Sequence, residues 1–248
     1  MPQNIYDNPE FFAGYDNLRE TESGLNEALE QPAFRSLLPA DVSGLRLLDL
    51  GCGAGEMCRW LADRGAASVT GTDISERMLQ KAQKQVQERV TYIRGSAEEI
   101  TFPPASFDLV VSSLMLHYIQ EIKPVLEKIY TWLAPGGKFV FSMEHPVTTA
   151  AQGLIEPRWE TDAAGRRIAW RLAHYSDESE RVSVWFVDGV VKYHRTTATM
   201  INALVETGFR ITRMLEPHAT EAAEQARPDL LEERMRPPFL FIAAEKTL

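Results

Sequence analysis

The sequence predicts an α/β protein with a doubly wound, mostly parallel sheet of seven strands. Short segments rich in Val, Leu, Ile and Phe alternate with amphipathic segments over residues 45–141. This alternation is typical of a parallel sheet with helices on both faces. A glycine-rich turn follows the first apolar segment, and Asp73 ends the second. These two features predict a ligand site at the carboxyl edge of the sheet.

Seven segments are predicted to be strands because each is apolar and too short for a helix. Five of them precede residue 144, and they cover residues 45–50, 68–73, 90–94, 107–113 and 138–143. Two more end the chain, at residues 210–216 and 239–245.

Five helices are predicted from capping residues and apolar periodicity. Ser75, for example, is a suitable N-cap before a segment whose Met78, Leu79 and Ala82 share one helical face. These five helices are residues 10–19, a segment ending near Pro39, the segment after Ser75, residues 121–134 and residues 196–207, and a sixth is predicted to begin after the glycine-rich turn. The first two precede the sheet, where they can cover its open edge.

We expect one domain over residues 1–248 with four parts. These are an N-terminal helical lid (1–40), a cofactor-binding core (41–143), an insertion after the fifth strand (144–195) and a C-terminal helix with two strands (196–248). The insertion has aromatic residues among many charges and no sustained period. It is long for a connection, which predicts that it has a task of its own.

Composition excludes several kinds of protein. The chain has 26 basic and 35 acidic residues and a formal net charge of −9, which argues against a nucleic-acid partner. No apolar run is long enough to cross a membrane and no secretory signal is present, so we expect a cytoplasmic monomer or homodimer. Cys52 and Cys58 suit neither a disulfide framework nor a metal site, and we expect free thiols and no metal.

The glycine-rich turn predicts a nucleotide-like ligand. It runs Asp49-Leu50-Gly51-Cys52-Gly53-Ala54-Gly55 between a predicted strand and a predicted helix, where the backbone must turn sharply and approach a ligand closely. Asp73 lies 22 residues after Gly51, the spacing at which a doubly wound sheet places a ribose-binding carboxylate. Taken singly, the turn could be an ordinary βα connection and Asp73 a helix cap. Their combination favours the ligand site.

The residue at position 56 distinguishes between nucleoside cofactors. A dinucleotide fingerprint requires a third glycine there, and this chain has Glu56. A pyrophosphate would meet that carboxylate. S-adenosylmethionine has no phosphate and has a cationic sulfonium and ammonium, so acids such as Asp49 and Glu56 favour it.

Residues 45–142, about two fifths of the chain, resemble the class I S-adenosylmethionine-dependent methyltransferases, particularly their small-molecule branch, which have a Rossmann-like fold. The resemblance lies in the glycine turn, in Val69-Thr70-Gly71-Thr72-Asp73-Ile74-Ser75, and in the segments around Asp108 and Pro135. It implies the product S-adenosylhomocysteine and a small-molecule acceptor. It implies cofactor contacts at Tyr15, Arg19, Asp49, Gly51, Cys52, Gly53, Asp73, Ile74, Met78, Ser96, Ala97 and Glu98.

Within this set, Asp49 would hold the ammonium group, Asp73 the ribose, and Ile74 with Met78 the adenine. Relatives often have Asp where this chain has Ser96. Tyr15 and Arg19 resemble residues that close over the cofactor, although simple helix packing is an equal alternative.

The acceptor is predicted to lie beyond the fourth and fifth strands, near Ser112, which would border the methyl group. The segment Ser112-Ser113-Leu114-Met115 lacks the Asn-Pro-Pro-Tyr motif of amino-methyltransferases that act on bases. Methyl transfer needs a base only if the nucleophile arrives protonated, and His117 and His145 are the candidates. A structural role is the alternative for each histidine.

Four aromatic residues are predicted to contact the acceptor: Tyr6, Trp159, Trp170 and Trp185. A small satellite core is the alternative for the tryptophans. The alternative functions are an RNA or protein methyltransferase, a non-catalytic partner subunit that binds the cofactor, and a dehydrogenase. The sequence does not identify the acceptor or its reacting atom.

Overall fold

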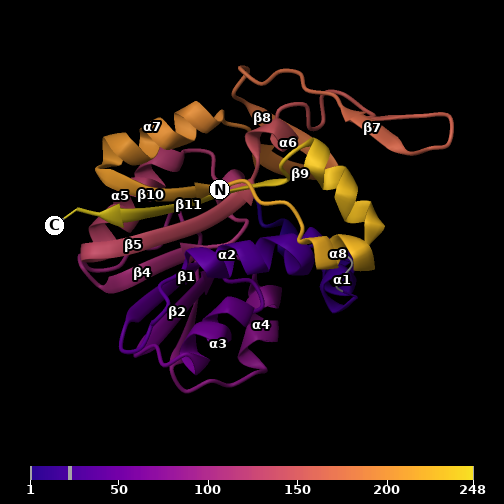
Figure 1. Cartoon of the computed structure of the whole chain (residues 1–248). Coiled ribbons are helices and arrows are strands. Elements are labelled where there is room, and N and C mark those ends of the chain that lie inside the picture. The colour runs from indigo at the N-terminus through magenta and orange to yellow at the C-terminus, as the bar shows by residue number, and fades with distance from the viewer. Residues whose placement is uncertain (1, 22–23, 248) are drawn as a thin grey trace.

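The computed structural model describes residues 2–21 and 24–247. At its centre lies a seven-stranded sheet in the order β10-β11-β5-β4-β1-β2-β3 (Figure 1). Its strands are β1 (Arg46–Leu50), β2 (Ser68–Asp73), β3 (Val90–Arg94), β4 (Phe107–Ser112), β5 (Leu133–Glu144), β10 (Phe209–Leu215) and β11 (Phe239–Lys246). Within this sheet β11 is antiparallel to both neighbours and the pairs among β1 to β5 are parallel. The predicted mostly parallel seven-stranded sheet is confirmed.

Helices cover both faces of the sheet (Figure 1). The α5 and α7 helices pack on one face, and α2, α3 and α4 pack on the other. The α-helices before the insertion and the one after it are α1 (Pro9–Glu20), α2 (Gln31–Leu37), α3 (Glu56–Asp63), α4 (Glu76–Gln83), α5 (Ile122–Trp132) and α7 (Thr197–Thr207). The short helical segments around the site are η1 (Ile5–Asp7), η2 (Asn26–Glu30) and η3 (Leu116–Tyr118).

The central strand β1 shows why both faces need helices. Leu48 and Leu50 are buried on the α5 side, whereas Leu47 is buried on the α3 side. Successive side chains of a strand point to opposite faces, so a strand with leucines on both faces must be covered twice. This arrangement leaves the strand ends as the place for polar groups.

The helix ends follow the predicted caps. Ser75 Oγ accepts the Met78 N–H at 3.1 Å, and Thr196 caps α7 in the same way. Gly208 ends α7 with φ +105, a conformation that glycine tolerates without strain. The predicted start of the fifth strand, at residue 138, was wrong. The strand β5 begins at Leu133, because Leu133 already pairs with Phe107 of β4, and the register shifts before Lys138 pairs with Leu109.

The insertion forms one short helix and two β-hairpins beyond the carboxyl ends of the strands (Figure 1). Its elements are α6 (Pro146–Thr149), β6 (Trp159–Thr161), β7 (Arg167–Trp170), β8 (Glu180–Trp185) and β9 (Val187–Tyr193). Their short, half-exposed strands lack a clear period, so the sequence did not predict them. It also did not predict α8 (Glu221–Ala226) and η4 (Pro228–Met235), which connect β10 to β11.

Arg181 holds the insertion together. Its side chain is buried, and its guanidinium donates to the carbonyl oxygens of Ala150 at 3.0 Å and Asp177 at 2.7 Å and to Ser179 Oγ at 2.5 Å. These bonds connect the segment after α6 to the segment before β8. Removing one partner of a buried hydrogen bond leaves the other without a partner, which costs about 1–3 kcal/mol per group.

We therefore expect Arg181→Met to loosen the insertion by about 2 kcal/mol or more while the sheet stays intact. Hydrogen exchange should become faster across residues 150–195 and stay unchanged in β1, β4 and β5. Arg166→Met is the matched control, because the Arg166 side chain is 80% exposed. Equal exchange in the two variants would show that Arg181 does not hold this segment.

Candidate active site

A cavity of about 450 Å³ lies at the carboxyl edge of the sheet. Its lining comes from segments far apart in the sequence: the N-terminal helices, the turns after β1, β2 and β3, η3 after β4, the β5–α6 junction, the end of β8 and the residues just before β11. Figure 1 shows α1, α6, α8 and the hairpin β8–β9 gathered at this end of the sheet.

The glycine turn brings bare backbone to the cavity. Gly53 has φ +52, and a Cβ there would meet no atom within 4 Å, so any side chain would project into open space. Gly51 has φ +80, and a Cβ there would meet the Met115 side chain at 2.5 Å. Both positions therefore require glycine if a ligand is to lie against the backbone.

Asp73 connects this turn to the next one. Its carboxylate accepts the Gly53 N–H at 2.9 Å and the Ser75 N–H at 2.8 Å. Burial raises the pKa of Asp73 despite these two bonds. The carboxylate lines the cavity at the predicted ribose position.

Asp49 is buried at the end of β1, where Cys58 Sγ donates to it at 3.2 Å. Burial raises the pKa of Asp49 to about 7, and the nearby carboxyl groups of Asp73 and Glu30 add to this effect. Cys52 and Cys58 are both free and buried.

Basic side chains neutralise only some of the acidic side chains that line the cavity near the glycine turn. Arg19 pairs with Glu56 and with Glu27, and Lys81 pairs with Asp16. Asp49 and Asp73 have no such partner among residues 2–21 and 24–247. Two buried acids beside a cavity are stabilised by a cationic or hydroxyl-bearing ligand, which fits S-adenosylmethionine.

The structure brings together nearly all of the predicted cofactor residues. Besides those described above, the cavity is lined by Tyr15, Arg19, Cys52, Ile74, Met78, Ser96, Ala97 and Glu98. The prediction for Ser112 was wrong. Its side chain is fully buried inside the sheet and donates to the Leu50 carbonyl at 2.8 Å, so Ser113 and Leu114 line the cavity instead.

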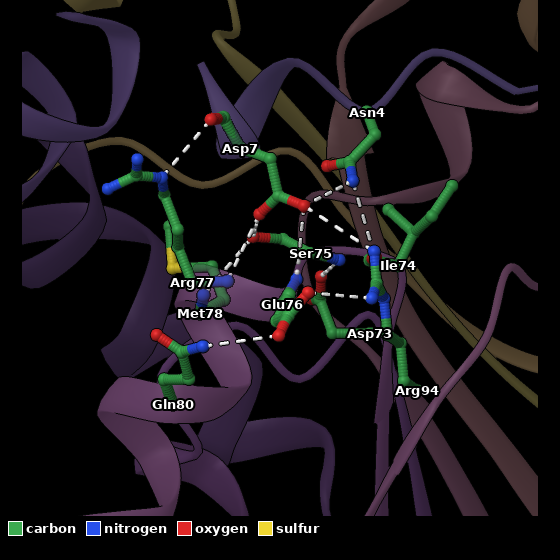
Figure 2. A network of polar contacts seen from close by, with 10 residues as sticks. All are labelled: Asn4, Asp7, Asp73, Ile74, Ser75, Glu76, Arg77, Met78, Gln80 and Arg94. Atoms are coloured by element: carbon green, nitrogen blue, oxygen red, sulfur yellow. Dashed lines mark hydrogen bonds and ion pairs between the residues drawn. The ribbon is translucent and has the colours of Figure 1, made fainter. Parts of the chain in front are cut away.

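The N-terminal segment is fastened over the cavity by Asp7 (Figure 2). The Asp7 carboxylate accepts Ser75 Oγ–H at 2.6 Å and the Arg77 N–H at 3.0 Å, and thus caps the start of α4. Asn4 donates to the same carboxylate at 2.7 Å and to the Ile74 carbonyl at 3.4 Å. Burial opposes ionisation of Asp7, but these hydrogen bonds outweigh it and lower the pKa.

Aromatic residues surround the other end of the cavity. Tyr6, Tyr118 and Trp185 line it, and the hydroxyl oxygens of Tyr6 and Tyr118 are 3.5 Å apart. Tyr15 stands edge-on to both Tyr6 and Trp185. The N-terminal helices and the hairpin β8–β9 therefore close this end together.

The two predicted histidines differ in position. His117 lines the cavity, and its Nδ1 accepts the Glu144 N–H at 3.3 Å, which leaves the proton on Nε2. Burial lowers the pKa of His117 to about 3. A neutral ring of this kind donates a hydrogen bond through Nε2 and has no free nitrogen to take a proton.

His145 does not line the cavity, so its predicted catalytic role was wrong. Its Nδ1 accepts the Val147 N–H at 3.0 Å as the N-cap of α6, and its Nε2 contacts Glu216 at 2.8 Å. Both ring nitrogens are used to hold α6 against the strand edge. His145 follows the end of β5 directly, but this position in the sequence does not show which way its ring points.

Glu144 and Lys192 form a buried ion pair at the aromatic end, and the sequence did not predict it. Lys192 lies 5.0 Å from the Trp185 ring centroid and 5.7 Å from that of Tyr118. Burial opposes ionisation of Glu144, but the Lys192 ammonium outweighs it and lowers the pKa. No local pattern in the sequence identified this pair, because the segment around Lys192 has no sustained apolar alternation.

Trp159 and Trp170 do not line the cavity, and the prediction that they contact the acceptor was wrong. They face each other across the hairpin β6–β7. The guanidinium carbon of Arg236 lies 4.5 Å from the Trp170 ring centroid and 5.3 Å from that of Trp159. Arg236 itself lines the cavity, so the tryptophans contribute through this arginine.

The fold and the cavity define a doubly wound α/β protein with a cavity at the glycine turn. Residues 48–141 match a family described as a methyltransferase domain. An S-adenosylmethionine-dependent methyltransferase from Mesorhizobium loti is 44% identical, with a TM-score of 0.82 over 90% of this chain and 100% of that one. The chain belongs to the S-adenosylmethionine-dependent methyltransferases and uses S-adenosylmethionine as its cofactor.

Two further relatives extend the comparison. An uncharacterized protein from Haemophilus influenzae is 39% identical over 98% of this chain and 96% of its own length. A malonyl-[acyl-carrier protein] O-methyltransferase from Enterobacter lignolyticus is 36% identical, but over 46% of this chain and 42% of its own length. Within the described residues, none of the helices is long and apolar enough to cross a membrane.

Asp7→Ala should weaken S-adenosylhomocysteine binding about fivefold, since loss of a helix cap costs about 1 kcal/mol. The physical reason is that the N-terminal segment, which includes Tyr6 and Tyr15, would lose its attachment to α4. Calorimetry measures the change. Glu10→Ala is the control, because Glu10 is exposed on the same segment. An unchanged dissociation constant for Asp7→Ala would contradict the role of this attachment.

Proposed function

We propose that the protein transfers the methyl group of S-adenosylmethionine to a small organic acceptor held at the aromatic end of the cavity. The observation that supports this best is that one continuous cavity has two chemically different ends. The end at the glycine turn is acidic, and the other end is formed by Tyr6, Tyr118 and Trp185. Cavities of this size commonly hold small molecules.

For the cofactor, we propose that Asp49 binds the ammonium group and Asp73 the ribose hydroxyls. The bare backbone of Gly51 and Gly53 would lie against the methionine part, and Ile74 and Met78 against the adenine. Ser96, Ala97 and Glu98 would border the adenine edge. Neither Asp49 nor Asp73 has a cationic partner among the described residues, and this supports the assignment.

When bound, S-adenosylmethionine supplies a methyl group that is already activated for displacement. The residues of this chain then need to align the acceptor and exclude water. Tyr6, Tyr15 and Trp185 would exclude water at the aromatic end. His117 would orient the acceptor through its Nε2 hydrogen, and Glu144, which is ionised, is a better candidate than either histidine to accept a hydrogen bond from a protic nucleophile.

Several observations favour a small acceptor over a macromolecule. Residues 5–20 and the hairpin β8–β9 cover the cavity, which favours their proposed role as a lid and restricts the size of what can enter. The net charge of −9 does not suit a nucleic acid.

The function is tested in two steps. Calorimetry should show binding of S-adenosylhomocysteine and none of NAD, because Glu56 occupies the position where a pyrophosphate needs glycine. Incubation with labelled S-adenosylmethionine and a panel of metabolites, followed by mass spectrometry, should then identify a methylated small molecule. Binding of NAD in preference to S-adenosylhomocysteine would refute the proposal. If the label appeared only in protein or RNA, the acceptor would be a macromolecule and not a small molecule.

Cofactor affinity should depend on pH through Asp49. Without a ligand its pKa is about 7, whereas an ammonium group binds only the ionised carboxylate well. Protonation as the pH falls through about 7 therefore removes the binding partner, and S-adenosylhomocysteine should bind about tenfold more weakly at pH 6 than at pH 8.

Calorimetry across this pH range measures the effect. Asp49→Asn should bind more weakly and nearly independently of pH, whereas Asp41→Asn, at an exposed carboxyl, should retain the full dependence. A flat profile in the parent protein would mean that Asp49 does not hold the ammonium group.

A further inference from the structure

Arg236 is the side chain in the cavity lining whose hydrogen-bonding capacity is least used. Its side chain is 10% exposed, and Nη1 contacts Glu233 Oε2 at 3.0 Å and Thr148 Oγ1 at 3.2 Å. Its Nε is buried and has no hydrogen-bond partner among the residues that the structure describes. In the same described ranges Nη2 makes no hydrogen bond or ion pair.

Nε and Nη2, which form one edge of the guanidinium, therefore have no hydrogen-bond partner among the described residues, and Nε lies beneath neighbouring atoms. We call this edge the free edge. Nε and Nη2 donate in parallel directions, and this edge is the one that binds a carboxylate with two hydrogen bonds. A buried donor without a partner costs about 1–3 kcal/mol, which a bound anion would recover. The opposite nitrogen, Nη1, is already held by the protein, so the orientation of the free edge is set.

Three arginines and their acidic partners surround the two tryptophans. Arg158 and Arg167 lie over the same two tryptophans, 5.6 Å from the Trp170 ring centroid and 4.9 Å from that of Trp159. The acids that face this cluster are Glu233, at Arg236, and Glu156 and Glu232, which pair with Arg158 and Arg167. Glu144 also lies nearby, but Lys192 balances its charge.

We infer that the free edge of Arg236 binds a carboxylate of the methyl acceptor. This inference rests on the proposed function, because it assigns the chemistry of the molecule at the aromatic end. The two ends of the cavity would then carry opposite charges, with acidic side chains beside the cationic cofactor and an arginine beside the anionic acceptor. Trp159 and Trp170 act as positioning residues, since both rings lie against the guanidinium.

The geometry also explains why the two tryptophans lie outside the cavity. A guanidinium has many rotamers, and ordering it on binding costs conformational entropy. Stacking on two rings fixes the arginine beforehand, so less entropy is lost when a ligand binds. The hairpin β6–β7 contacts Arg236 of the cavity lining through its two tryptophans, and Trp170 Nε1–H donates to the Val147 carbonyl of α6 at 3.2 Å.

The inference is tested with two matched probes on protein saturated with S-adenosylhomocysteine. Phenylacetate has a ring for the aromatic end and a carboxylate, and phenylacetamide has the same shape without the charge. Ligand-detected NMR titration should show that phenylacetate binds at least tenfold more tightly than the amide, as expected when a charge-assisted pair replaces a neutral hydrogen bond. The Arg236 Nε–H resonance should move downfield with phenylacetate.

Three variants make the test specific. Arg236→Gln should remove the preference for phenylacetate, and Arg236→Lys should reduce it because a lysine retains the charge but lacks the two-donor edge. Arg167→Gln is the matched control: Arg167 lies over Trp159, as Arg236 does, but it is 43% exposed and does not line the cavity. It should bind phenylacetate within about twofold of the parent.

The outcomes separate this inference from the proposed function. Absence of S-adenosylhomocysteine binding in the parent protein would contradict the proposed function. With S-adenosylhomocysteine bound normally, the inference is overturned by equal binding of acid and amide, by an unchanged phenylacetate affinity in folded Arg236→Gln, or by an equal loss in Arg167→Gln. Retained S-adenosylhomocysteine affinity in each variant shows that it is folded.

Discussion

The Asp73 carboxylate is the contact on which the site depends most. It accepts one N–H from the glycine turn and one from the start of α4, so it holds the turns after β1 and β2 at a set distance. Asp7 extends the connection, because it caps the same helix through Ser75 and brings the N-terminal segment over the cavity (Figure 2). These two carboxylates thus link the sheet edge, the glycine turn and the N-terminal segment.

A parallel sheet explains why such distant segments meet. The carboxyl ends of β1, β2, β4 and β5 lie at one edge, and each strand is followed there by a turn or short helix. The insertion and the segment before β11 leave the sheet at the same edge (Figure 1). The cofactor end is built from consecutive βα units, whereas the aromatic end combines segments as distant as Tyr6, Trp185 and Arg236.

This difference explains how much of the site could be predicted. Glycine at positions 51 and 53 and Asp73 at a strand end are local requirements of backbone geometry, and they appear in the sequence at recognisable spacing. The role of Arg236 could not be predicted in this way. Its position depends on the packing of hairpin β6–β7 against the residues before β11, and no local pattern in the sequence encodes a contact between them.

The sequence by itself determined the fold class, the strand order along the chain and the family of the cofactor, because apolar periodicity, caps and glycine turns act over a few residues. The tertiary structure decided the orientation of individual side chains. His117 and His145 follow neighbouring strands, yet one ring faces the cavity and the other caps α6 against Glu216. Which way a polar ring turns depends on the hydrogen-bond partners that distant segments supply, and these exist only after the chain has folded.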